Sequence, residues 1–92
     1  MIRSFRSSAL KRFWERSDDR KLPDEHLGKI TRILDALEAA LSPQDMDMPG
    51  FAFHALKGDQ KGRYAVTVRA NWRITFGWER DDAIEVDYED YH

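Results

Sequence analysis

Apolar residues in the first half of the chain recur with the spacing of amphipathic helices. Ser7 and Ser8 provide hydroxyl groups that can cap a helix, and we expect this helix to end near Arg16. Its apolar face is formed by residues at i, i+3 and i+4, namely Leu10, Phe13 and Trp14. Residues 2–5, just before it, alternate apolar and polar and predict a short edge strand.

A longer helix is predicted after a polar loop at residues 17–22. Pro23 suits a helix start, and the acidic residues Asp24 and Glu25 suit the positive end of the helix dipole. The apolar stripe that follows has alternating spacings of three and four residues: Leu27, Ile30, Leu34, Leu37 and Leu41. The stripe is too short to favour a coiled coil over packing on a sheet. The Ser-Pro pair at 42–43 predicts the end of the helix.

From residue 51 onward the period changes from that of a helix to that of a strand. Apolar and polar residues alternate over the segments 51–56, 64–69, 72–78 and 84–88, with turn residues between them. Strands joined in sequence by short turns form an antiparallel meander. The sequence therefore predicts one α+β domain, residues 1–92, with two N-terminal helices packed on one face of a mostly antiparallel sheet of about four or five strands.

The composition restricts the chemistry that is available. The 92 residues are 41% hydrophobic and 35% charged, which fits one small domain without a membrane-spanning segment. The start of the chain lacks a signal-peptide pattern, so we expect a soluble, cytoplasmic protein without membrane contact. The absence of cysteine excludes disulfides, thiolate zinc sites and cysteine nucleophiles. The three histidines are scattered and lack a His-x-x-x-His pair, so we expect neither a metal nor another cofactor.

The charges are unevenly distributed along the chain. The net charge is -2, yet residues 51–78 carry five basic residues and one acidic residue. Residues 79–92 carry one basic residue and seven acidic residues. If the basic segment folds into one sheet, it presents a local positive face that can hold a phosphate on an acidic protein. Solvated surface charge explains the same counts, so composition alone leaves both interpretations open.

The histidines differ in their settings. His26 lies in the first turn of the predicted long helix beside two acidic residues, and we interpret it as a solvated surface residue. His54 lies in a strand of Phe, Ala and Leu residues, where a hydrogen-bonded structural histidine is the simplest interpretation. The chain then ends on Asp90, Tyr91 and His92, just beyond the last predicted strand, where chain ends usually fray.

Taken together, these residue types suit the cleavage of an RNA backbone. RNA carries its own nucleophile, the 2'-OH, so a protein only has to accept its proton, stabilise the charge on phosphorus and protonate the leaving 5'-oxygen. Imidazole exchanges protons near neutral pH, and Lys57 and Arg73 are cations that can hold the phosphate. Arg73 alternates with Trp72 and Ile74, so the guanidinium points away from the core if those two residues face it.

Several collinear motifs resemble those of the HigB toxins of the RelE superfamily. The motifs are Ile33-Leu34-Asp35-Ala36-Leu37, Pro49-Gly50, His54-Ala55-Leu56-Lys57-Gly58-Asp59, Asn71-Trp72-Arg73-Ile74-Thr75-Phe76 and Val86-Asp87-Tyr88-Glu89-Asp90-Tyr91-His92. The resemblance implies a RelE-like fold and a bacterial toxin of a type II toxin-antitoxin pair, which cleaves messenger RNA in the ribosomal A site and inhibits translation. It implies catalytic roles for His54, Asp90, Tyr91 and His92, and substrate contacts for Lys57, Asn71 and Arg73.

The resemblance also implies partners. These are a helix-turn-helix antitoxin similar to HigA, the ribosome with its message, and operator DNA reached only through the antitoxin complex. Two alternatives stay open at this point. A ParE-like toxin shares the fold but acts on DNA gyrase, and the presence of His54, Tyr91 and His92 argues against it. A non-enzymatic module would only bind a partner through its apolar helix or its basic sheet face.

Overall fold

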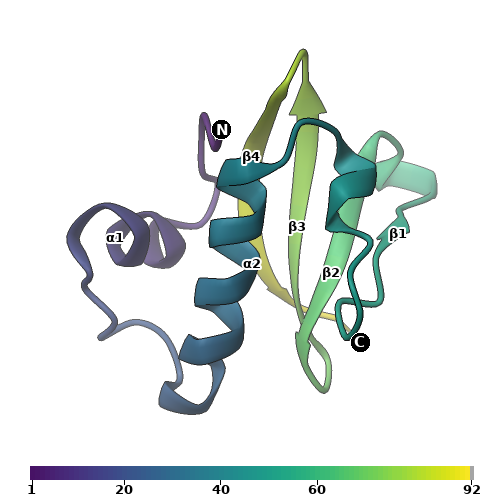
Figure 1. Cartoon of the computed structure of the whole chain (residues 1–92). Coiled ribbons are helices and arrows are strands. Elements are labelled where there is room, and N and C mark those ends of the chain that lie inside the picture. The colour runs from purple at the N-terminus through teal and green to yellow at the C-terminus, as the bar shows by residue number, and fades with distance from the viewer. Residues whose placement is uncertain (92) are drawn as a thin grey trace.

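The computed structural model describes residues 1–91, which form a four-stranded antiparallel sheet with helix α2 across one face (Figure 1). The elements are α1 (Ser8–Arg16), α2 (Leu27–Ala39), β1 (His54–Ala55), β2 (Arg63–Arg69), β3 (Trp72–Glu79) and β4 (Asp82–Asp90). The strands lie in chain order, and each pairs with the next. Helix α1 lies beside the β4 edge of the sheet (Figure 1). The predicted α+β fold class is confirmed.

The first helix agrees closely with its prediction. Ser7 is the N-cap, and its hydroxyl oxygen accepts a hydrogen bond from the backbone N–H of Leu10 at 3.2 Å. Residues 2–5 supply two isolated parallel bridges, from Ile2 to Ala83 and from Phe5 to Val86. The predicted edge pairing is therefore present, reduced to two bridges that cover the outer edge of β4. No helix within residues 1–91 is long and apolar enough to cross a membrane.

The hydrophobic core lies between α2 and the sheet. Side chains with no exposed surface come from both layers: Ile30, Ile33, Leu34, Leu37, Val66, Ile74, Phe76 and Val86. The predicted stripe is wrong at its end, because α2 stops at Ala39 and Leu41 is 76% exposed. The carboxylate of Asp45 accepts hydrogen bonds from the backbone N–H groups of Leu41 and Ser42 at 2.8 and 3.2 Å. These groups thus find partners outside the helix, which ends before the Ser-Pro pair.

The predicted strand at residues 51–56 is much shorter in the structure. The strand itself consists of His54 and Ala55, which pair with Ala65 and Tyr64 of β2. Phe51 is buried, and its carbonyl oxygen accepts a hydrogen bond from the N–H of Thr67 at 2.7 Å. Ala52 then has a φ of 49°, in the left-handed region, which interrupts the alternation of a regular strand. As a result, His54 lies exposed on a short edge strand.

The interpretation of His26 as a solvated surface residue is wrong. Its side chain is buried, with 5% of its surface exposed, and its Nδ1 lies 2.5 Å from the hydroxyl oxygen of Tyr88. The physical reason is local geometry: Asp24–His26 forms a 3-10 turn, and α2 begins only at Leu27. The tighter 3-10 turn changes the direction of each side chain relative to an α-helical first turn. His26 therefore faces β4, whereas Asp24 and Glu25 stay exposed.

Candidate active site

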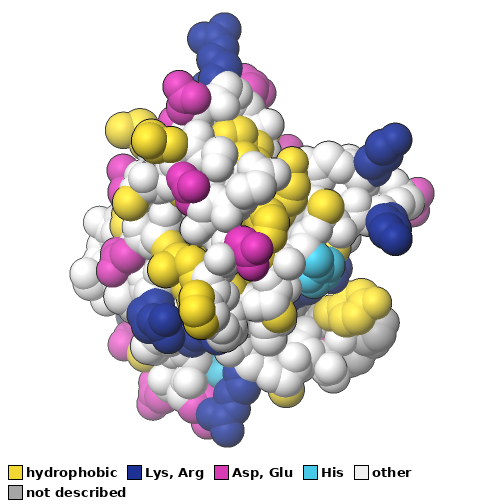
Figure 2. Space-filling model, turned by 45° about the vertical axis from the view of Figure 1, so that its right-hand side comes forward, with side chains coloured by type: hydrophobic (Ala, Val, Ile, Leu, Met, Phe, Trp, Pro, Cys, Tyr) yellow, Lys and Arg dark blue, Asp and Glu magenta, His cyan; other side chains and the backbone are white. Residues whose placement is uncertain are grey.

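Two hollows in the surface share three side chains, those of His54, Arg73 and Tyr91. The larger hollow has a volume of about 560 Å³ and is completed by the end of β1 and the segment that follows it: Ala55, Leu56, Lys57, Asp59 and Gln60. The smaller has a volume of about 250 Å³ and is completed by the end of β2, the β2–β3 turn and the first residue of β3: Thr67, Ala70, Asn71 and Trp72. On the face shown in Figure 2, a histidine side chain lies at the rim of a hollow.

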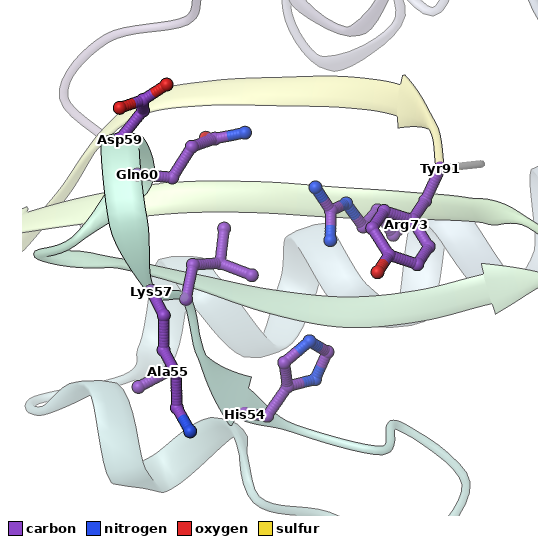
Figure 3. Close-up of a pocket in the computed structure, with 8 residues that line it drawn as sticks. His54, Ala55, Lys57, Asp59, Gln60, Arg73 and Tyr91 are labelled. Carbon is purple, nitrogen blue, oxygen red and sulfur yellow. The ribbon is translucent and has the colours of Figure 1, made fainter.

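The guanidinium of Arg73 is held against the ring of Tyr91. The Cζ atom of Arg73 lies 4.3 Å from the centroid of that ring, a cation–π contact (Figure 3). Strand register explains the contact, because Arg73 pairs with Glu89 and Tyr91 follows two residues later on the same face. The backbone N–H of Tyr91 donates to the carbonyl oxygen of Asn71 at 2.7 Å. This bond continues the pairing one residue beyond β4 and fixes the backbone beneath the tyrosine ring.

The ring of His54 has a defined tautomer. Its Nδ1 lies 3.0 Å from the carbonyl oxygen of Ala52. Because a carbonyl oxygen only accepts, Nδ1 carries the hydrogen and donates it, which leaves Nε2 of the neutral ring as a proton acceptor. Ala52 is the residue with left-handed backbone, so the irregular geometry before β1 and the tautomer of His54 are linked. The ring is directed toward Arg73 and Tyr91 in Figure 3.

The predicted substrate contacts lie around these three residues. Lys57 lines the larger hollow, although its ammonium group extends away from Arg73 and Tyr91 in Figure 3. Asn71 lines the smaller hollow. Gln60, which the sequence placed only in a turn, also lines the larger hollow. The structure therefore brings five of the predicted site residues together and adds an amide that sequence reasoning missed.

Asp90 differs from His54 and Tyr91, which line both hollows. Among the described residues that line the two hollows, Asp90 does not appear. It alternates with Glu89 and Tyr91 along the chain and so shares a face with Tyr88. Burial, together with the charge of Asp90, raises the pKa of Tyr88 to about 12. His92 lies outside the described residues.

A hydrogen-bonded chain across three strands adjoins the site and was not predicted. The Nη2 group of Arg63 donates to the hydroxyl oxygen of Thr75 at 3.0 Å and to the carbonyl oxygen of Glu85 at 2.9 Å. The Thr75 hydroxyl donates in turn to a carboxylate oxygen of Glu89 at 2.5 Å. Glu89 is the strand partner of Arg73. The strand register places Arg63, Thr75 and Glu89 on the same face of the sheet as Arg73, and that register could not be obtained from the alternation alone.

Burial determines the electrostatics of the hydrogen-bonded residues Arg63, Thr75 and Glu89. Removal from solvent lowers the pKa of the Arg63 guanidinium, and the carboxylate of Glu89 opposes that effect. Thr75 has no exposed surface. A buried polar group without a partner is costly, so the bonds that Thr75 makes to both neighbours fix the strands beneath Arg73.

The site offers an imidazole, a phenol, a guanidinium and an ammonium group. Within residues 1–91, no three His, Asp or Glu side chains come together as a group that could hold a metal ion. An unprotonated imidazole nitrogen can accept a proton, and a guanidinium can bind two oxygens of a phosphate. The arrangement is therefore suited to acid–base chemistry on a phosphodiester.

Comparison with known proteins identifies the family. The sequence profile described as "RelE-like toxin of type II toxin-antitoxin system HigB" matches residues 3–92. This chain belongs to the HigB-like toxins. "Endoribonuclease HigB" of Proteus vulgaris is 38% identical over 92 residues, which is 100% of both chains. "Toxin HigB-1" of Vibrio cholerae is 30% identical over 82 residues, which is 85% of this chain and 84% of that one.

Solved structures of other toxins show the same fold as this HigB-like toxin. The YoeB dimer from Staphylococcus aureus matches with a TM-score of 0.57 and 16% identity, covering 99% of this chain and 97% of that one. A YafQ mutant from E. coli matches with a TM-score of 0.56 and 13% identity, covering 94% and 91%. The resemblance to HigB toxins and the RelE-like fold are thus confirmed. As a toxin of a type II toxin-antitoxin system, the protein has an antitoxin as its partner.

Proposed function

We propose that this toxin is an endoribonuclease that cuts messenger RNA in the ribosomal A site, without a metal, and so inhibits translation. One observation carries the proposal: His54, Arg73 and Tyr91 meet between two hollows. A proton acceptor, a cation and a phenol then surround one point on the surface. Support also comes from the full-length relative, which is named an endoribonuclease.

The proposed reaction uses the substrate's own nucleophile. Nε2 of His54 accepts the proton of the 2'-OH, and the 2'-oxygen forms a bond to phosphorus. The guanidinium of Arg73 stabilises the charge that develops on the phosphate oxygens. The bond from phosphorus to the 5'-oxygen of the next nucleotide breaks, and this oxygen takes a proton from the terminal pair Tyr91 and His92. The products are a 2',3'-cyclic phosphate and a 5'-OH.

The two hollows fit a nucleic-acid chain that crosses the site. With the scissile phosphate at Arg73, one neighbouring nucleotide lies in each hollow. Lys57 and Gln60 then contact one side of the cut, and Asn71 contacts the other. The net charge of -2 provides little non-specific attraction for RNA, so we expect the ribosome to hold the message in place for the toxin.

The decisive experiment uses purified toxin, ribosomes stalled on a defined message and primer extension to locate the cut. We expect a cut within the A-site codon, and none when the same RNA is offered without ribosomes. Wild-type toxin that leaves ribosome-bound message intact but inhibits DNA supercoiling by gyrase would instead establish the ParE-like alternative. Toxin that does neither would be a binding module.

The chemical ends of the fragments should reveal the mechanism. We expect a 2',3'-cyclic phosphate on the upstream fragment and a 5'-OH on the downstream one, because the 2'-oxygen is the nucleophile and the site is built from organic acid–base groups. End-specific ligation and mass spectrometry of the fragments measure this. A 5'-phosphate on the downstream fragment is the signature of attack by water and would contradict the mechanism.

Operator binding should require the antitoxin. We propose that the antitoxin is a HigA-like protein with a helix-turn-helix domain, and that only the complex binds its operator DNA. The toxin has a net charge of -2, and α1, its most basic helix, carries only three basic residues and one acidic residue, so it lacks the strongly basic helix that specific duplex binding usually needs. A gel-shift titration with toxin, antitoxin and their complex measures this. Tight, sequence-specific binding by the isolated toxin would refute the prediction.

A further inference from the structure

Three rings cluster on the face of the sheet that α2 covers, behind the candidate active site. The hydroxyl oxygen of Tyr88 lies 2.5 Å from Nδ1 of His26. The ring of Trp72 stacks on that of Tyr88, with centroids 4.6 Å apart and an angle of 17° between the planes. The rings of His26 and Trp72 lie 6.2 Å apart. We call this the His26–Tyr88–Trp72 cluster.

The cluster joins three parts of the chain that are distant in sequence. His26 comes from the 3-10 turn before α2, Trp72 begins β3, and Tyr88 lies near the end of β4. His26 and Tyr88 are 62 positions apart. Trp72 is also a lining residue of the smaller hollow, so this residue connects the cluster to the site.

The cluster anchors the end of β4 on the face opposite to the hydrogen bond that Glu89 accepts from Thr75. Trp72 pairs with Asp90, and Tyr91 follows with its N–H bonded to the carbonyl oxygen of Asn71. The side chain of Tyr91 is 59% exposed, so packing does little to hold it over Arg73. Terminal residues fray unless they are tied down. The order of Tyr91 therefore depends on how firmly the preceding strand end is held.

The hydroxyl of Tyr88 is not explained by packing alone. A phenylalanine ring would stack on Trp72 equally well, whereas a half-buried hydroxyl costs free energy unless it finds a partner. His26 supplies that partner while itself being 5% exposed. With its pKa raised to about 12, the Tyr88 hydroxyl stays protonated at neutral pH. It can therefore donate a hydrogen bond to Nδ1 of His26. The hydrogen bond thus ties the strand end to the start of α2.

We propose that Tyr88 and His26 are positioning residues of this toxin, whose hydrogen bond holds the end of β4 so that Tyr91 stays over Arg73 and beside His54. The inference rests on the proposed ribonuclease function. It adds to the site two residues that do not touch the substrate. Their effect is transmitted through the backbone from Tyr88 to Tyr91.

The first test is Tyr88→Phe, which removes the hydroxyl and keeps the ring. We expect kcat on ribosome-bound message to fall by roughly 10- to 100-fold while KM stays nearly unchanged, because a displaced catalytic group slows the chemical step. Tyr64→Phe is the matched control, since Tyr64 is also half-buried and stacks on Phe53 and Phe76 away from the cluster. Equal kcat values for the two variants would overturn the proposal.

The His26 side of the bond is tested with a conservative and a non-conservative variant. His26→Asn keeps a polar group near the position of Nδ1, whereas His26→Leu removes it. We expect His26→Asn to retain most of the wild-type kcat and His26→Leu to lose it, with melting temperatures measured for both. Equal loss in the two variants would refute a role for the hydrogen bond. If Tyr88→Phe does not fold, the comparison of His26→Asn with His26→Leu still tests whether the hydrogen bond positions Tyr91.

A double-mutant cycle separates positioning from general destabilisation. In a Tyr91→Ala background, Tyr88→Phe should cause no further loss of kcat, because the residue that it positions is gone. A loss as large as in the wild-type background would show a merely structural role. If Tyr91→Ala itself keeps the wild-type rate, the proposed site fails and the positioning role fails with it. If Tyr91→Ala is inactive but Tyr88→Phe is fully active, only the positioning role fails.

Discussion

Deletion of residues 91 and 92 is expected to abolish cleavage while leaving the fold and antitoxin binding intact. Strand β4 itself ends at Asp90, which is the strand partner of Trp72. Tyr91 is 59% exposed, and the contacts that the structure describes for it are one backbone hydrogen bond and one cation–π contact, worth about 1 to 2 kcal/mol in the free energy of unfolding. The cleavage rate should fall far more than the stability does. Tyr91 and His92 act together in the proposed reaction, and removing groups that act as a unit abolishes what they do jointly.

The measurements are thermal melting, antitoxin pull-down and the cleavage rate on ribosome-bound message. Tyr91→Phe serves as the matched variant, because it keeps the ring over Arg73 and removes only the hydroxyl. Truncated toxin that still cuts at the wild-type rate, and still arrests growth when expressed without its antitoxin, would show that the chain end is an ordinary tail. The assignment of Tyr91 and His92 would then be wrong.

Substitution of His54 should remove the general base. His54→Ala is expected to lower kcat by roughly 10² to 10⁴, the usual contribution of one acid–base group. The melting temperature should change little, because His54 is exposed on an edge strand and makes one side-chain hydrogen bond, to Ala52. Single-turnover kinetics on ribosome-bound message and a thermal melt measure the two effects.

His54→Gln distinguishes a proton acceptor from a group that only fills space or donates a hydrogen bond. Glutamine can place an amide near the position of Nε2, yet it cannot take up a proton at neutral pH. We therefore expect His54→Gln to be as inactive as His54→Ala. Recovery of most of the wild-type rate in His54→Gln would contradict the role of His54 as the base and would leave it as a substrate contact.

Local patterns in the sequence predicted the elements and the faces of the central strands. The helix-capping hydroxyl of Ser7 and the apolar spacing of α1 depend on neighbouring residues only, and both agree with the structure. The alternation around Trp72 and Arg73 correctly separated a ring that stacks on Tyr88 from a guanidinium that lines the hollows. These features have periods of a few residues, which a sequence displays directly.

The catalytic role predicted for Asp90 came from the resemblance to HigB toxins and not from the strand pattern. The sequence pattern predicted a last strand over residues 84–88, with Asp90 and Tyr91 beyond it. In the structure β4 extends to Asp90, and successive residues of a strand face opposite sides. Tyr91 therefore joins His54 and Arg73, whereas a catalytic role for Asp90 stays a prediction.

The sequence by itself determined the α+β order of elements, the core face of α2 and the motifs that carry the likeness to HigB toxins. Tertiary structure alone decided the burial of His26 against Tyr88, the shortening of β1 to His54–Ala55, and the meeting of the two hollows at Arg73. The physical reason is the range of the interactions. Helix and strand periods arise between near neighbours, whereas these contacts depend on strand register and on how the turn before α2 packs against β4.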